Sequence, residues 1–141
     1  MKRIIILCLF GLLCGAAPAA IPGKALQGDE AVTAFWQKFK AAVISGNRRE
    51  VSSLSKFPIG MSYGIASIKN KSQLQRRYRE VFNQQSNAAQ CFAGKQPEMD
   101  AENPKRFNVA CPDSAGNEVV IYQFERTTKG WKFVGLDNIN E

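Results

Sequence analysis

The chain has 141 residues, of which 45% are hydrophobic and 22% charged, and it contains nine Phe. These values exclude a disordered chain and indicate one globular domain with an aromatic core. The formal net charge is +7 and there is no histidine, which excludes His-dependent nucleophilic catalysis and His-based metal sites.

The N-terminal residues have the order of a secretion signal. Residues 1–3 are positively charged at physiological pH, residues 4–13 are apolar but too few to span a bilayer permanently, and small residues follow up to Ala19. A buried N-terminal strand or helix is the alternative. The expected organisation is a signal peptide at 1–19, a linker at 20–28 and a single α+β domain at 29–141, in the periplasm or outside the cell.

Cys14 opens another possibility for this segment, a lipid-attached membrane tether. Lipoprotein signals usually have a small residue where Leu13 stands, which weighs against lipidation. The chain is therefore expected to touch a membrane only if Cys14 is lipidated.

The basic residues are unevenly distributed along the chain. Residues 24–82 contain eleven Lys or Arg against four Asp or Glu, whereas residues 83–141 contain six against eight. Such asymmetry can attract an acidic partner or an anionic surface, although solvated helix faces explain it as well. No aromatic residues alternate with the basic ones in the manner that stacks bases, so we expect no nucleic-acid binding.

Two cysteines, Cys91 and Cys111, lie within the expected domain. In an oxidising compartment such a pair predicts one disulfide. The alternative, a redox or catalytic thiol, lacks both a CxxC spacing and a histidine base.

The first predicted helix begins at Asp29, which can act as its N-cap, and ends before Gly46. Apolar residues recur along it at intervals of three and four, which is the spacing of one buried helix face. These residues are Val32, Phe35, Trp36, Phe39 and Val43.

Two further helices are predicted after Gly46. Asn47 and Glu50 form a capping-box pattern that opens a helix ending at Phe57, before Pro58. Residues 58–67 fit either a short edge strand or an ordered loop, and the pattern does not decide between them. A third helix then runs over residues 70–82.

From residue 88 onward the apolar period changes from helical to alternating. Residues 88–93 are predicted as a strand that contains Cys91, and residues 95–104 as a connection. Strands follow at 107–111, at 118–127 and from Trp131, separated by turns at 112–117 and 129–130. Three helices followed by four antiparallel strands is an α+β arrangement in which the helices cover one face of the sheet. Neighbouring first and second strands would place Cys91 beside Cys111.

This order of elements resembles the nuclear transport factor 2-like (NTF2-like) superfamily over residues 29–139. The resemblance is carried by segments 35–39 (FWQKF) and 130–133 (GWKF), the latter leading to Asp137. Shorter segments also contribute, at 41–43, 57–58, 70–71, 77–78 and 81–82. It implies three N-terminal helices packed on a curved four-stranded antiparallel sheet, with a pocket between them. Members of the superfamily use that pocket for catalysis, ligand binding or protein contacts, so the fold alone does not choose a function.

The resemblance directs attention to residues that could line the pocket. These candidates are Trp36, Phe39, Tyr63, Tyr78, Tyr122, Trp131 and Asp137. We expect an exported non-catalytic module that binds a small molecule, an acidic protein or the cell envelope, as a monomer or homodimer and without cofactor or metal. The alternative is a small isomerase or dehydratase that uses a tyrosine and Asp137.

Structure can separate these two interpretations. Asp137 within hydrogen-bond reach of an inward tyrosine would favour the enzyme. A pocket filled by Trp36, Phe39, Tyr122 and Trp131 would favour the module.

Overall fold

The computed structural model describes residues 26–62 and 66–139. The predicted signal peptide at 1–19, Cys14 and Tyr63 lie outside these ranges. The described helices are α1 (Leu26–Ile44), α2 (Arg48–Ser53), α3 (Lys71–Arg76), the π-helix η1 (Glu80–Gln84) and α4 (Ala88–Gly94). The described strands are β1 (Ser55–Met61), β2 (Ser67–Ile68), β3 (Glu98–Met99), β4 (Arg106–Pro112), β5 (Glu118–Thr127) and β6 (Gly130–Asn138).

The strands form one six-stranded mixed sheet in the order β2-β1-β6-β5-β4-β3. The prediction of four antiparallel strands was therefore wrong in number and direction, although the α+β class and the curved sheet are confirmed. β1, from the segment that fitted either a strand or a loop, pairs with β6 in parallel and with β2 antiparallel. Because parallel pairing joins segments that are far apart in the chain, a local sequence pattern cannot predict it.

The segment predicted as the first strand is a helix. α4 occupies Ala88–Gly94, and its buried residues Ala88, Cys91 and Phe92 follow a helical spacing of three and four. Asn87 caps it by accepting a hydrogen bond from the Gln90 amide at 3.2 Å. The strand prediction failed because a seven-residue segment offers too few positions to separate a period of two from 3.6.

Other boundaries also differ from those predicted. α1 begins at Leu26, so Asp29 lies inside the helix and is not its N-cap. α2 ends at Ser53 and the chain enters β1 before Pro58. The third predicted helix is divided into α3 and η1. The predicted stop at Gly46 is confirmed by its left-handed φ of 65°.

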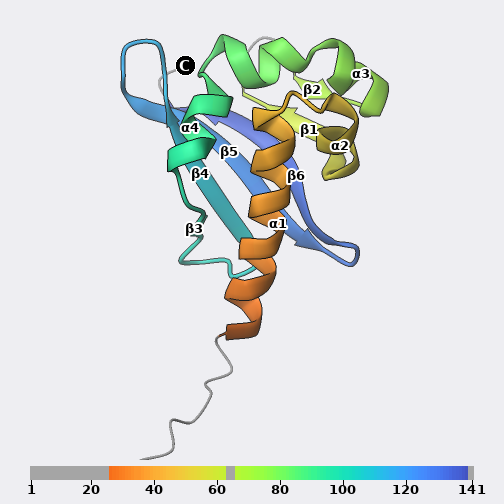
Figure 1. Ribbon diagram of the computed structural model, residues 1–141, viewed down its shortest axis with the longest axis vertical. Coiled ribbons are helices and arrows are strands. Elements are labelled where there is room, and N and C mark those ends of the chain that lie inside the picture. Colours follow the sequence, from red (N-terminus) through yellow and green to blue (C-terminus); the bar gives the residue numbers. More distant parts are fainter. Residues whose placement is uncertain (1–25, 63–65, 140–141) are drawn as a thin grey trace, which may run out of the picture.

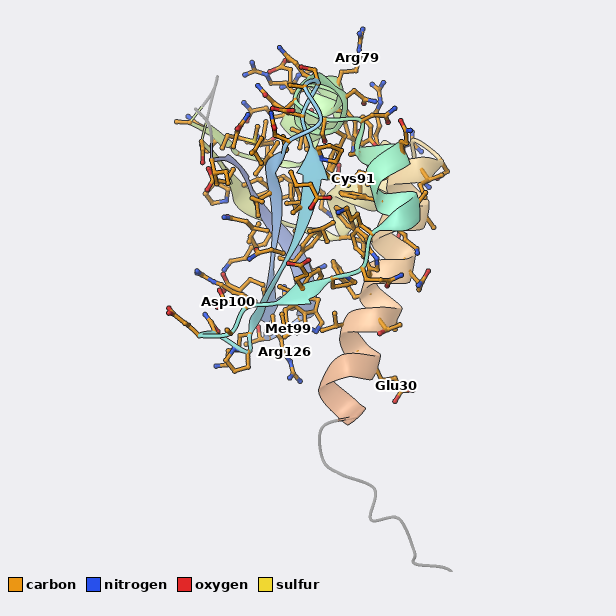
Figure 2. All side chains as sticks on the ribbon, turned by 90° about the vertical axis from the view of Figure 1, so that its left-hand side faces the viewer. Glu30, Arg79, Cys91, Met99, Asp100 and Arg126 are labelled. Atoms are coloured by element: carbon orange, nitrogen blue, oxygen red, sulfur yellow. A yellow bond between two sulfur atoms is a disulfide. The ribbon has the colours of Figure 1, made fainter. Side chains whose placement is uncertain are left out.

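The aromatic face of α1 is buried against the sheet. Figure 1 shows α1 crossing the sheet, and Figure 2 shows α1 and α4 on the same side of it. Phe39, at the centre, has no exposed surface, and its ring centroid lies 5.0 Å from that of Phe124 and 5.6 Å from that of Phe133. These contacts join the first helix to the last two strands in one hydrophobic core.

A disulfide joins Cys91 of α4 to Cys111 of β4, as predicted. The predicted reason for their proximity was wrong, because Cys91 lies on a helix and not on a neighbouring strand. The bond fixes α4 against β4 beside the hairpin between β4 and β5.

Candidate binding surface

The space between α1 and the sheet is filled by four of the predicted pocket residues. Trp36, Phe39 and Tyr122 have no exposed surface, and Trp131 is 7% exposed. The indole of Trp36 donates a hydrogen bond to the Lys95 carbonyl at 3.2 Å. The structure therefore brings these residues together as core rather than as the wall of a hollow.

The hydroxyl groups of the two described tyrosines are engaged by the protein itself. Tyr122 donates to the Val81 carbonyl at 3.0 Å and lies 2.9 Å from the Ser86 hydroxyl. Tyr78 donates to the Val43 carbonyl at 3.2 Å. Burial raises the pKa of Tyr78, and the nearby Arg48 guanidinium partly offsets this. Both side chains thus have the satisfied polar tip typical of a structural tyrosine.

Asp137 lies on the face of the sheet opposite Tyr122. Asp137 pairs across the strands with Ile121, whereas Tyr122 pairs with Leu136, and adjacent positions on a strand face opposite sides. An irregularity in the pairing inserts one extra residue into β6 after Phe133. This extra residue reverses the alternation, so Asp137 does not join the core face that Phe133 occupies.

Asn138, and not the pocket candidate Asp137, takes the inward position at the end of β6. Its side chain is only 5% exposed, and its amide donates to the Gln85 side-chain oxygen at 3.1 Å. The inward polar group at the end of β6 is therefore a neutral amide, engaged with the segment that follows η1.

The strongest concentration of charge lies on α2, α3 and the turns beside them. We call this surface the basic end, and it comprises Arg48, Arg49, Lys69, Lys71, Arg76, Arg77 and Arg79. Arg48 links α2 to α3 by donating to the Gln75 carbonyl at 3.3 Å, and its guanidinium lies 5.4 Å from the centre of the Tyr78 ring. Among the described residues, only Arg77 of this group has an ion-pair partner, Glu80 at 2.6 Å. Six cations are thus left without a neutralising carboxylate in the described part of the chain.

The positive field extends from the basic end along the side of the molecule. Lys132 on β6 donates to the Ser53 carbonyl at 2.8 Å. The pKa of Lys132 is lowered mainly by partial burial. Repulsion from Lys71, Lys38 and Lys129 lowers it further. Lysines on α1, on α3 and in the β5–β6 turn therefore all act on Lys132.

Three surface hollows meet at Asn83, the fourth residue of η1. The first, about 570 Å³, runs between η1, α4 and the β4–β5 hairpin. The second, about 310 Å³, is lined by Arg48, Tyr78 and Arg79. The third, about 380 Å³, is lined by Arg76, Arg79, Gln84 and Glu80, whose carboxylate pairs with Arg77. Asn83 lines all three hollows, so the three hollows lie around η1 and share it as a wall. π-Helices often accompany functional sites.

Side-chain amides are the commonest groups in the lining of the first hollow, and we call it the amide groove. Its amides are Asn83, Gln84, Gln85, Asn87 and Gln90. On the far side the Lys95 ammonium pairs with the Glu118 carboxylate. Asp113 lies on the same rim of the groove. Its pKa is lowered by backbone hydrogen bonds to its carboxylate, of which the bond from Asn117 has the largest effect. The groove is therefore close to neutral and rich in donors and acceptors, whereas the adjoining hollows are basic.

Sequence reasoning did not identify the residues around η1 as a site. Arg76 and Arg79 were assigned to a solvated helix face, and residues 83–87 (NQQSN) only marked the end of a helix. The available signal was that run of five consecutive polar, uncharged residues directly after an arginine-rich helix.

Within the described ranges there is no group of three or more Cys, Asp or Glu side chains placed to hold a metal ion. The helices in those ranges also include none with the length and apolar character needed to cross a bilayer.

No protein-family model and no curated protein matches the sequence. Solved structures do match. An NTF2-like protein with a cystatin-like fold from Novosphingobium aromaticivorans is 16% identical, with 82% of each chain covered and a TM-score of 0.45. An NTF2-like protein of unknown function from Pseudomonas putida is 10% identical, with 80% of this chain and 85% of that chain covered and a TM-score of 0.44.

A Mycobacterium tuberculosis protein in complex with estradiol-17β-hemisuccinate also matches. It is 10% identical, with 77% of this chain and 92% of that chain covered and a TM-score of 0.46. NTF2-like proteins are thus among the matches. Likenesses at this level identify neither a ligand nor an activity for this chain.

Proposed function

We propose that this chain, which resembles the NTF2-like fold, is an exported non-catalytic binding module whose partner is negatively charged and docks on the basic end. The observation that carries the proposal is the set of six cations there without an ion-pair partner among the described residues. A folded chain gains nothing internally from holding like charges together, because their mutual repulsion costs free energy. An external anion would relieve that repulsion.

The filled interior supports a binding module over an enzyme. An isomerase or dehydratase needs a base and a proton donor facing one apolar cavity. Here the hydroxyls of Tyr122 and Tyr78 donate to backbone carbonyls. Asp137 lies on the opposite face of the sheet from Tyr122. A ligand therefore has to be bound at the surface.

The Cys91–Cys111 disulfide supports an extracytoplasmic location, because structural disulfides are rare in reducing compartments. The residues with the signal-peptide pattern lie outside the described ranges, so export remains part of the proposal.

The proposal can be tested by comparing charge reversals at two ends of the molecule. Figure 2 places Arg79 at one end and Arg126 at the other. The test variant is Arg76→Glu/Arg79→Glu. The matched control is Lys105→Glu/Arg126→Glu, which changes the net charge by the same amount at exposed positions. Binding of oligoglutamate is measured by isothermal titration calorimetry at low and physiological salt.

The unmodified chain should bind oligoglutamate more weakly as salt rises, because exposed charges are screened within about 10 Å at 0.1 M ionic strength. The test variant should bind at least about tenfold more weakly at low salt, and the control variant should lose much less. Equal losses in the two variants would show that only net charge matters and would refute the proposed docking surface.

A further inference from the structure

We propose that the three hollows around η1 form one continuous site for an acidic polysaccharide, with arginines binding its anionic groups and side-chain amides binding its hydroxyls. This inference rests on the proposed function and names the class of partner.

The charged half of the site is built by three guanidinium groups. Arg48 and Arg79 line one hollow, and Arg76 and Arg79 line the next. None of the three pairs with a carboxylate among the described residues. Guanidinium groups bind carboxylate, phosphate and sulfate oxygens in a bidentate manner, so these hollows suit the acidic groups of a polymer.

The neutral half of the site is built by amides that remain available. Asn83 and Gln84 are exposed and make no side-chain hydrogen bond within the described part of the chain. The Gln85 oxygen accepts from Asn138, which orients that amide and leaves its NH₂ group to donate. An amide can donate to one hydroxyl and accept from another, which is the pairing that adjacent sugar hydroxyls require.

The same lining disfavours a protein partner. Protein interfaces depend on a few aromatic or aliphatic anchors, whereas the large hydrophobic side chains Val43, Tyr78 and Phe82, which line the second hollow, are buried in the core and cannot contact a partner. Among the described residues, the large exposed hydrophobics are Ile44, Met99 and Ile139, of which only Ile44 lines one of the three hollows. A membrane surface could use the arginines but would not enter a concave groove lined by amides.

The experiment compares two polycarboxylates of equal charge, of which only one carries sugar hydroxyls. Binding of oligogalacturonate and of oligoglutamate with the same number of carboxylates is measured by isothermal titration calorimetry under identical salt. Oligogalacturonate is expected to bind at least about tenfold more tightly, because it adds hydroxyl contacts to the same charge contacts.

The variant Asn83→Ala/Gln84→Ala removes two exposed amides at the junction of the hollows. It should weaken oligogalacturonate binding about tenfold and leave oligoglutamate binding unchanged. The control variant Gln37→Ala/Gln96→Ala, also at exposed positions but outside the three hollows, should change neither. Asn83→Leu provides a second measurement that preserves side-chain size but removes the donor and the acceptor, and it should weaken only oligogalacturonate binding.

The outcomes separate this inference from the proposed function. If the two probes bind equally, if oligoglutamate binds more tightly, or if the amide variants affect both probes alike, the polysaccharide site is wrong and the anion-binding surface stands. If Arg76→Glu/Arg79→Glu affects neither probe more than its control does, the proposed function fails as well.

Discussion

Reducing the Cys91–Cys111 disulfide should markedly destabilise the domain. The bond joins residues separated by 20 positions, and the chain-entropy estimate for a loop of that length is about 3 kcal/mol. For a domain of this size, that corresponds to a fall in melting temperature of about 10–15 °C. Loss of the bond should loosen α4 first, because the bond holds α4 against β4. α4 also forms one wall of the amide groove.

The assay is urea unfolding followed by circular dichroism, with and without reductant, after intact-mass analysis of alkylated protein has established the state of the thiols. The double variant Cys91→Ala/Cys111→Ala serves as the control. Reductant should not affect it, and its free energy of unfolding should match that of the reduced chain. Two freely alkylated thiols at these positions in protein from its native compartment would contradict the disulfide. A change below about 1 kcal/mol on reduction would refute the argument that the loop constraint stabilises the fold.

Three further predictions concern the core. Phe39→Ala should cost about 3–5 kcal/mol in urea unfolding, because Phe39 is fully buried among aromatic rings, and a loss below 1 kcal/mol would mean that the core repacks. Tyr122→Phe should cost about 1–3 kcal/mol by leaving the buried Val81 carbonyl and Ser86 hydroxyl without their partner, and an unchanged stability would point to a replacing water molecule. Burial raises the pKa of Tyr78, so its contribution to stability is present below pH 10.0 and is lost as pH rises through the higher folded-state pKa. Unfolding measured at pH 9 and pH 11 should therefore show a smaller alkaline loss in Tyr78→Phe, and equal losses would count against this assignment.

The proposals change where a ligand is sought on this fold. The resemblance to the NTF2-like superfamily implied a pocket between α1 and the sheet, where Trp36 and Tyr122 are instead packed as core. The three hollows that carry the proposals lie outside that core, around a π-helix between the basic end and α4. The outer face of the sheet, which carries the Lys56–Glu125–Arg106 ion pairs at 3.5 and 3.8 Å, does not enter the proposals, and homodimerisation remains a prediction.

The candidate site could be predicted only in part from sequence. The excess of basic residues was visible, and its possible attraction for anions was stated. What could not be seen is that Arg76, Arg79 and Asn83 share a hollow, because this depends on the turn from α3 into the wider π-helix. The outward position of Asp137 has a similar cause, since one extra residue in β6 reverses which side chains face the core.

By itself, the sequence determined the features that depend on neighbours along the chain. The buried face of α1, centred on Phe39, follows from helical spacing, and the stop at Gly46 follows from glycine's tolerance of positive φ. The Cys91–Cys111 bond was also predicted, because two cysteines in one domain allow a single internal pairing. Only the tertiary structure decided the parallel pairing of β1 with β6, the helical state of residues 88–94 and the outward position of Asp137. These features depend on contacts between distant segments, whose packing free energy outweighs the weak local preferences of short stretches of chain.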